Sequence, residues 1–209
     1  MQLNQKSWKE YFWKKINWSV RVLILSDVLV ICAFGLVSPI FAVYVTEQIE
    51  DGGVEVIGIA ATIFLLVRSL GQLPIAGLID KIKGELDDYW LLVIGSILTS
   101  FVPLLYILAT TPTHLYLIGV IYGILAAFTL PTWYAIFTRH VDHNREGIEW
   151  SLYTTLTDVS AAAAAAIGGY IAATLGFNTL FVVVSAVALF GSLMLIFMHK
   201  DMRKARKLF

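Results

Sequence analysis

The chain has 209 residues, of which 58% are hydrophobic and 14% are charged, and its mean hydropathy is +0.78. Soluble domains carry nearer a quarter of charged residues, so this composition excludes an ordinary soluble fold and predicts an integral membrane protein. The formal net charge of zero gives no indication of a nucleic-acid partner. The single cysteine, Cys32, excludes a disulfide framework or a thiolate metal site within one chain.

Six apolar runs are each long enough to cross a bilayer. A helix of about 20 residues rises roughly 30 Å, which is the thickness of the hydrocarbon core. The connections between the runs are short and leave no stretch for a separate soluble domain. The last run is almost wholly aliphatic, and we expect it to face lipid. The predicted spans are residues 22–45, 56–79, 89–109, 115–137, 152–175 and 179–198.

Basic residues lie almost entirely on one side of these spans. Of the 15 lysines and arginines, 14 lie before the first span, in the second and fourth connections, or after the last span. The first connection, on the opposite side, holds Glu47, Glu50, Asp51 and Glu55. The positive-inside rule therefore predicts a multi-pass protein of an inner or plasma membrane with both termini in the cytoplasm.

The chain divides into three predicted parts. Residues 1–19 mix aromatic residues with lysines, which is typical of an amphipathic segment lying in the headgroup region. The alternative for this segment is a basic tail that only sets the orientation. Residues 20–199 form the predicted membrane domain, and residues 200–209 form a basic cytoplasmic tail.

The connection between the second and third spans contains Gly77, Asp80, Lys81 and Gly84. This Gly-x-x-Asp-Lys group resembles the signature loop of the major facilitator superfamily. A small residue at position 77 lets a helix approach its neighbour closely, and Gly84 permits the tight turn that follows. We expect the charged pair of Asp80 and Lys81 to act as a gate latch on the cytoplasmic side.

A shift of 92 residues superposes the first three predicted spans on the last three. It pairs Pro39 with Pro131 and Gly77 with Gly169. Because each copy holds three spans, the two copies must run in opposite directions, as in the inverted repeat within each six-span half of major facilitator transporters. Residues 19–199 therefore resemble one such half.

This resemblance implies a function as well as a fold. It implies an all-α membrane protein that moves a small solute by alternating access, is not an enzyme and needs no cofactor. A full transporter of the superfamily has two parallel halves around a cavity. We therefore expect a parallel homodimer, with the first and fourth spans lining the cavity and the second and fifth spans at the interface. The alternative is a non-transporting membrane module, or a subunit that pairs with another half.

Three ionisable residues lie within predicted spans: Asp27, Arg68 and Asp158. Each costs roughly 2.5–3.5 kcal/mol at mid-helix on insertion scales, so such residues usually face a bundle interior or an aqueous cavity. We expect Asp27 to pair with Arg68 across an antiparallel hairpin, either only to lock the two spans or to form a solute or proton site. We expect Asp158 either to couple transport to protons or to contact Thr155 or Thr157.

Four aromatic residues of the spans are candidates for the cavity wall. They are Tyr44, Trp133, Tyr134 and Tyr153. No sequence motif of a water channel, a potassium-channel filter or a hydrolase is present, which favours a carrier over these alternatives.

The connection after the fourth span holds His140, Asp142 and His143. Such a cluster can bind a metal ion, but Arg139 and Arg145 would repel a cation there. The pattern therefore predicts a salt-bridged loop rather than a metal site.

Overall fold

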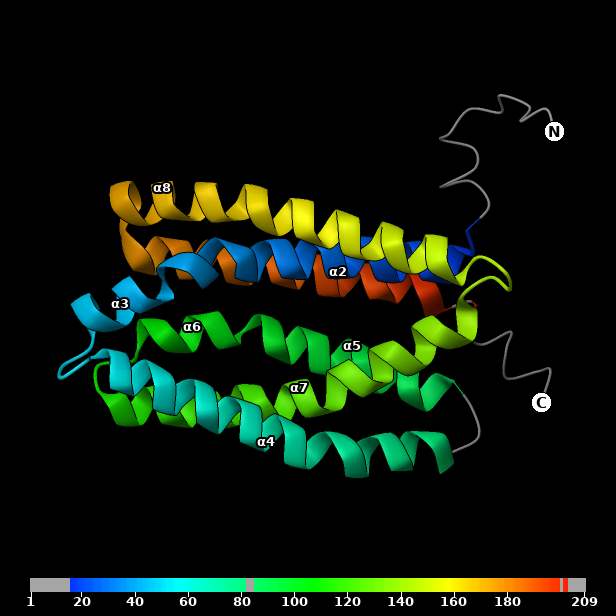
Figure 1. Ribbon diagram of the computed structural model, residues 1–209, viewed down its shortest axis with the longest axis horizontal. Coiled ribbons are helices and arrows are strands. Elements are labelled where there is room, and N and C mark those ends of the chain that lie inside the picture. Colours follow the sequence, from blue (N-terminus) through cyan, green and yellow to red (C-terminus); the bar gives the residue numbers. More distant parts are fainter. Residues whose placement is uncertain (1–15, 82–84, 200, 203–209) are drawn as a thin grey trace.

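The computed structural model describes residues 16–81, 85–199 and 201–202, and throughout these residues the regular structure is helical (Figure 1). Five stretches among them are long and apolar enough to cross a bilayer. These stretches are Trp18–Gln48, Val54–Lys81, Leu86–Ile107, Pro112–His140 and Glu146–Met198. The first 15 residues of the predicted interfacial segment, residues 1–19, and most of the basic tail fall outside the described part of the chain.

Proline interrupts the first stretch. Helix α2 (Trp18–Val37) ends in the short 3-10 helix η1 (Ser38–Ile40), after which α3 (Phe41–Gln48) continues toward the first loop. Pro39 lacks a backbone N–H and crowds the preceding turn, which explains the break at this point. In α7 (Pro112–His140), by contrast, the helix continues through Pro131.

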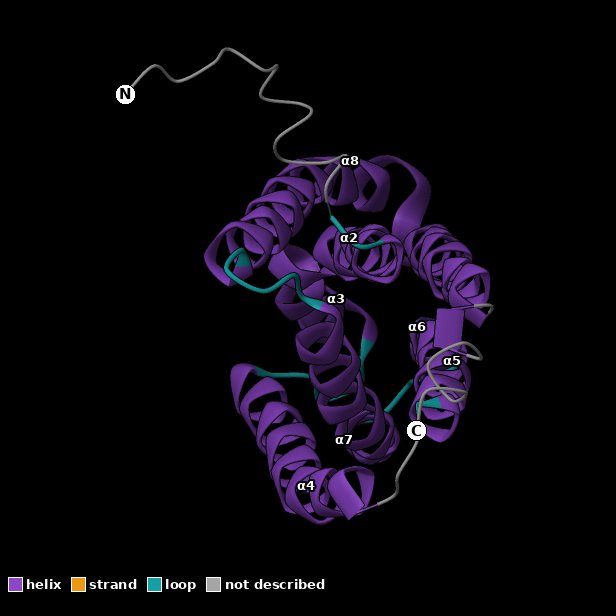
Figure 2. Cartoon of the chain, turned by 90° about the vertical axis from the view of Figure 1, so that its right-hand side faces the viewer, coloured by secondary structure: helices purple, strands orange, loops and turns teal. Residues whose placement is uncertain are grey.

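The long helix α8 (Glu146–Met194), followed by η2 (Leu195–Met198), consists of two helices that meet at a kink. Gly176 has φ +82° there, a backbone conformation that only glycine adopts readily. Residues on both sides of Gly176 lie against α2: Gly168 is beside Leu36, and Gly191 is beside Ser26. The chain therefore reverses its direction at Gly176. In Figure 2, the two parts of α8 flank α2.

The helices form two closely packed groups. Helix α2 packs most extensively against α8, and α4 (Val54–Lys81) packs against α7. Helix α5 (Leu86–Ser100) contacts both α7 and α8, and α6 (Val102–Ile107) packs mainly on α8. The expected hairpin of the first two spans is therefore wrong, because each of these helices has its main partner elsewhere in the bundle.

The expectation that residues 179–198 face lipid holds for one side of this segment only, where Val182, Phe190 and Phe197 are more than half exposed. Phe181, Val184 and Ala188 are fully buried between α2 and the α5–α6 pair. Small hydroxyls add hydrogen bonds at these contacts, since Ser185 Oγ donates to the Ser100 carbonyl at 2.7 Å. An aliphatic composition does not distinguish a lipid-facing helix from one buried among other apolar helices.

Glycines set how closely the helices approach. A Cβ added to Gly168 would overlap the Leu36 carbonyl of α2, and one added to Gly191 would lie 2.9 Å from the Ser26 carbonyl oxygen. In the other group, a Cβ on Gly123 of α7 would lie 2.9 Å from the carbonyl oxygen of Phe64 in α4. These contacts hold backbone against backbone, as is usual where helices associate by close packing.

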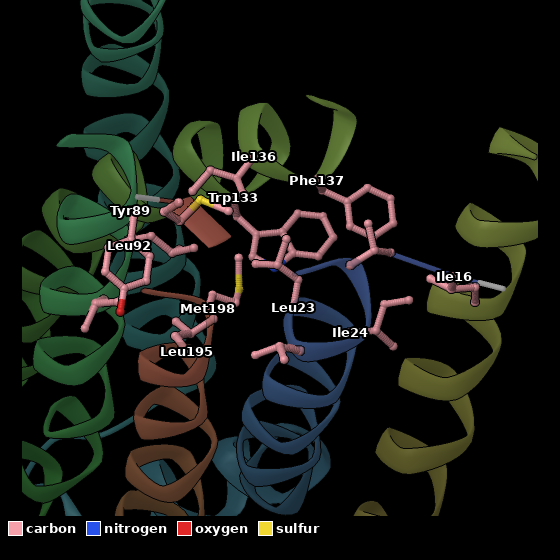
Figure 3. Packing of buried hydrophobic residues seen from close by; sticks show 14 residues of the cluster. Ile16, Leu23, Ile24, Tyr89, Leu92, Trp133, Ile136, Phe137, Leu195 and Met198 are labelled. Atoms are coloured by element: carbon pink, nitrogen blue, oxygen red, sulfur yellow. The ribbon is translucent and has the colours of Figure 1, made fainter. Parts of the chain in front are cut away.

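Buried side chains gather at both ends of the bundle. One cluster includes Leu23, Tyr89, Phe137 and Met198 and lies near the end that carries Lys81, Arg139 and Arg145, called the basic end below (Figure 3). A second cluster lies at the opposite end, where Tyr44, Val56, Leu115 and Phe181 pack together.

One ion pair and one histidine–glutamate contact join α7 to the start of α5 at the basic end. Arg139 Nη1 donates to the carboxylate of Asp88, whose side chain is almost fully buried. His140 Nε2 lies 3.5 Å from Glu85 Oε2. The loop predicted to be salt-bridged does contain an ion pair, that of Arg139 with Asp88. The described residues contain no group of three or more His, Cys, Asp and Glu suited to a metal ion.

Substituting Arg139→Gln should lower the free energy of unfolding by about 1–3 kcal/mol, because it leaves the buried Asp88 carboxylate without its charged donor. The double variant Asp88→Asn/Arg139→Gln removes the charge as well and should recover part of this loss. Thermal unfolding in detergent measures both variants against the parent. A double variant no more stable than the single one would contradict the assignment.

Candidate functional site

A cavity of about 630 Å³ lies between the two groups of helices. This volume is in the range of sites that enclose small molecules. Helices α2 and α7 supply most of the wall, while α4, α5 and α8 supply the rest. The predicted role of the first and fourth spans concerned a cavity between two copies, and it stays a prediction, because this cavity lies within one copy.

Asp27 lies in the cavity wall, on α2, and its carboxylate is held by a tyrosine. Tyr153 Oη donates to Asp27 Oδ2 at 2.6 Å, and the Tyr153 ring packs 4.7 Å from that of Trp133. Asp27 makes no ion pair with Arg68 among the described residues, so the predicted pairing of these two is wrong. The sequence suggested that Asp27 and Arg68 belong to one site, but it could not indicate that Tyr153 is the residue that binds the Asp27 carboxylate.

Arg68 also lines the cavity, from α4. Its guanidinium carbon lies 5.3 Å from the centre of the Phe64 ring, a cation–π arrangement. Its Nε is buried and has no hydrogen-bond partner in the described part of the chain. The cavity therefore contains a cationic group that no carboxylate of those residues approaches within ion-pairing distance.

Three of the four predicted aromatics contribute to the cavity wall: Trp133, Tyr134 and Tyr153. Trp133 Nε1 is buried and has no acceptor among the residues described. Tyr44 does not line the cavity. It lies in the cluster at the opposite end of the bundle, where its hydroxyl donates to the Tyr106 carbonyl at 2.6 Å.

Asp158 is exposed on the first part of α8 and does not line the cavity. Neither Thr155 nor Thr157 donates a hydrogen bond to its carboxylate in the described part of the chain, and Thr157 Oγ1 instead donates to the Tyr153 carbonyl at 3.0 Å. The structure therefore separates Asp158 from Asp27, which the predictions treated as members of one site.

Tyr122 is a cavity residue that the sequence reasoning missed. Its ring stacks between Phe34, at 5.6 Å, and Phe64, at 4.6 Å. Tyr122 lies on the same face of α7 as Trp133, at a spacing of three helical turns, and this periodicity was the available signal. The stack joins α2, α7 and α4 across the cavity.

The predicted gating residues end α4 at the basic end. Asp80 and Lys81 are exposed, and a Cβ added to Gly77 would meet no neighbour within 4 Å. Gly84 lies outside the described residues. The described chain thus leaves this group free to meet another protein surface.

The sequence model of the Major Facilitator Superfamily matches residues 23–208. The chain belongs to the major facilitator superfamily. Comparison with curated proteins and with solved structures gave no match. The match includes every residue that lines the cavity, so the part of the chain that defines the family also contains the candidate site.

Membership of the major facilitator superfamily explains the long apolar helices as membrane-spanning segments. Proteins of this superfamily are transporters rather than enzymes, and this one is a multi-pass membrane protein. The cavity between α2 and α7 is accordingly the candidate solute site of a major facilitator protein. Its polar groups are few, which suits a site that must both bind and release.

Proposed function

We propose that the protein is a secondary active transporter that binds a small solute in the cavity between α2 and α7 and exposes it alternately to each side of a cell membrane. The observation that carries this proposal is the placement of Asp27 and Tyr153 in the wall of an apolar, aromatic cavity. Ionisable groups within a bilayer usually mark solute or proton pathways.

The fold proposed for this function has six spans in two inverted repeats. The stretch Glu146–Met198 has 53 residues. As one helix it would be roughly 80 Å long, more than twice the thickness of a bilayer, so it supplies two spans that meet at Gly176. Packing supports the repeat: Gly71 of α4 faces Ala127 of α7, and Gly35, 92 residues before Ala127, faces Ala161 of α8.

Orientation follows from charge. Lys81, Arg139 and Arg145 lie at the basic end, and both termini leave the membrane domain on that side. The positive-inside rule supports a cytoplasmic position for this end and for both termini.

We further propose that two copies form the transporter as a parallel dimer. Helix α4 is the least covered of the long helices, with Leu66, Leu70 and Leu73 all more than half exposed. Helix α4 and the first part of α8 border the same open side of the molecule, with α2, α3 and α7 set back between them (Figure 2). A second copy related by an axis along the membrane normal would close this side, as the two halves of superfamily transporters do.

Asp27 is the proposed proton-coupling residue, and Tyr153 orients it. Trp133, Tyr134 and Arg68 are the proposed solute contacts, because each lines the cavity. Tyr44 and Asp158 do not line the cavity of their own copy. Tyr44 belongs to the cluster at the end opposite the basic end, and Asp158 is exposed on α8.

The proposal is tested in two steps. A thermal-shift screen of the purified protein against sugars, amino acids, organic anions and organic cations should find a stabilising solute, since binding to the folded state raises stability. Proteoliposomes should then accumulate that solute when a proton gradient is applied. No stabilising solute and no uptake from a protein shown to be folded would favour the alternative, a membrane module without transport activity.

The gate latch gives a separate prediction. Asp80→Ala should slow transport and shift the balance between inward- and outward-open forms, because the exposed carboxylate at the end of α4 no longer meets the partner copy. The matched control is Asp87→Ala, which removes another exposed carboxylate of the same end from α5. If the two variants transport at equal rates and a thiol reagent labels Cys32 equally in both, Asp80 does not act as a gate latch.

A further inference from the structure

Of the three ionisable residues inside the predicted spans, two have neither an ion pair nor a side-chain hydrogen bond among the described residues. They are Arg68 on α4 and Asp158 on the first part of α8. Asp27, the third such residue, is engaged by Tyr153. A lone charge in a bilayer is costly and usually finds a partner in a bundle or an aqueous space. Arg68 and Asp158 have opposite signs, but a single copy leaves both without a partner.

These two residues belong to the two helices that border the open side. In Figure 2, α4 forms one edge of that side and the first part of α8 forms the other. Arg68 is half-buried, at the cavity wall, and Asp158 is exposed. The two charges therefore flank the face that the proposed second copy would cover.

Their depths in the membrane agree. Arg68 lies 13 residues before Lys81, the last residue of α4, and Asp158 lies 12 residues after Glu146, the first residue of α8. Both of these helix ends lie on the same side of the bundle (Figure 1). At a rise of 1.5 Å per residue, Arg68 and Asp158 are about 20 and 18 Å from that end.

A two-fold axis along the membrane normal preserves depth. It brings α4 of one copy against α8 of the other, and because the interface is isologous the same contact forms twice. Residues that pair across such an interface must lie at equal depth on the two opposite edges. Arg68 and Asp158 meet both conditions and also complement each other in charge.

The surface around Asp158 also suits close approach of another helix. Ala162, Ala166 and Gly169 follow it at helical spacing along the same face. Ala162 and Ala166 are exposed, and a Cβ added to Gly169 would meet no neighbour within 4 Å. Small residues in this pattern let two membrane helices pack with their backbones close together.

We infer that Arg68 of one copy forms an ion pair with the partner's Asp158, and that the reciprocal pair forms on the other side of the two-fold axis. This inference rests on the proposed dimer. Because Arg68 lines the cavity, each copy completes its partner's cavity wall at that point. The two pairs explain why a single copy carries both an uncompensated cation and an uncompensated carboxylate at one depth.

The first test is disulfide crosslinking between differently tagged copies in native membranes, in a Cys32→Ala background. A copy with Arg68→Cys and a copy with Asp158→Cys should crosslink to each other on mild oxidation. The matched control joins Val54→Cys with Val159→Cys, two exposed positions of the same helices. Val54 lies 14 residues before Arg68, about 21 Å away along α4, so it does not share the depth of the proposed pair. Crosslinking of the control pair in place of the target pair would overturn the inference.

The second test exchanges the charges. Arg68→Asp and Asp158→Arg should each reduce co-purification of the two tags more than about tenfold, because each places like charges together in a dry interface. The double variant, which restores opposite charges, should recover co-purification. Recovery supports the pair even if a single variant folds poorly.

The outcomes separate this inference from the proposed function. Co-purification of two tags without target crosslinking and without recovery in the double variant overturns the pair but keeps the dimer. Absence of co-purification in the parent protein overturns the dimer and the pair together. Solute uptake, measured separately in proteoliposomes, decides whether the protein transports.

Discussion

Replacing Gly168 with alanine should destabilise the bundle strongly, whereas the same change at the adjacent Gly169 should leave it as stable as the parent or more so. The added Cβ at position 168 overlaps the backbone carbonyl of Leu36, whereas at 169 it meets nothing within 4 Å. A backbone group cannot turn aside as a side chain can, so α2 and α8 must separate. Overpacking of this kind typically costs about 1–3 kcal/mol or more.

The two glycines form their own control, because both lie within one helix and gain the same helix propensity, about 1 kcal/mol, on becoming alanine. Their difference in stability therefore measures the contact with α2 alone. Thermal unfolding and the yield of monodisperse protein in detergent are the measurements. Equal stabilities for Gly168→Ala and Gly169→Ala would show that α2 does not cross α8 at this point.

Substituting Asp27→Asn should abolish accumulation driven by a proton gradient while solute binding and downhill exchange continue. An amide has the shape of the carboxylate and can still accept the hydrogen bond from Tyr153, but it cannot take up and release a proton. Uptake under an imposed pH gradient should fall to the level of liposomes without protein. Exchange of labelled for unlabelled solute should stay measurable in the same preparation.

Tyr153→Phe separates coupling from positioning. It removes the hydroxyl that holds Asp27 but keeps the ring packed on Trp133. We expect it to shift the pH dependence of uptake without abolishing accumulation. The same preparations with Asp87→Asn, a change on the exposed first turn of α5, should behave like the parent. Full accumulation by Asp27→Asn would rule out Asp27 as the coupling group.

The position of Asp27 also shows how the fold creates the site. On α2, Asp27 is one residue from Ser26, whose hydroxyl donates to the Gly191 carbonyl at 2.8 Å. This bond and the close contact at Gly191 hold α2 against the last part of α8. Tyr153, from the first part of α8, then reaches the other side of α2. The two parts of one chain-reversing helix thus orient the carboxylate, and the kink at Gly176 allows both to do so.

Composition and pattern alone determined that this is a membrane protein with several long apolar helices, and they carried the family resemblance. These features depend on local properties: the length of an apolar run, the side on which lysines and arginines lie, and residue spacing in one loop. The same reasoning identified Asp27, Arg68, Trp133, Tyr134 and Tyr153 as site candidates, and the structure places all five at the cavity. Buried polar residues are rare enough in membrane spans to stand out without a structure.

Only the tertiary structure decided which helices are neighbours and therefore which charges meet. Asp27 and Arg68 lie on successive spans, yet α2 packs on α8 and α4 on α7, so Tyr153 binds Asp27 and Arg68 is left without a carboxylate. Tyr44 and Tyr153 are both tyrosines in apolar runs, but they lie at different depths and in different clusters. Hydrophobicity drives every span into the bilayer and distinguishes poorly among partners within it. The choice of partner falls to small residues such as Gly123 and Gly168, where backbones can touch.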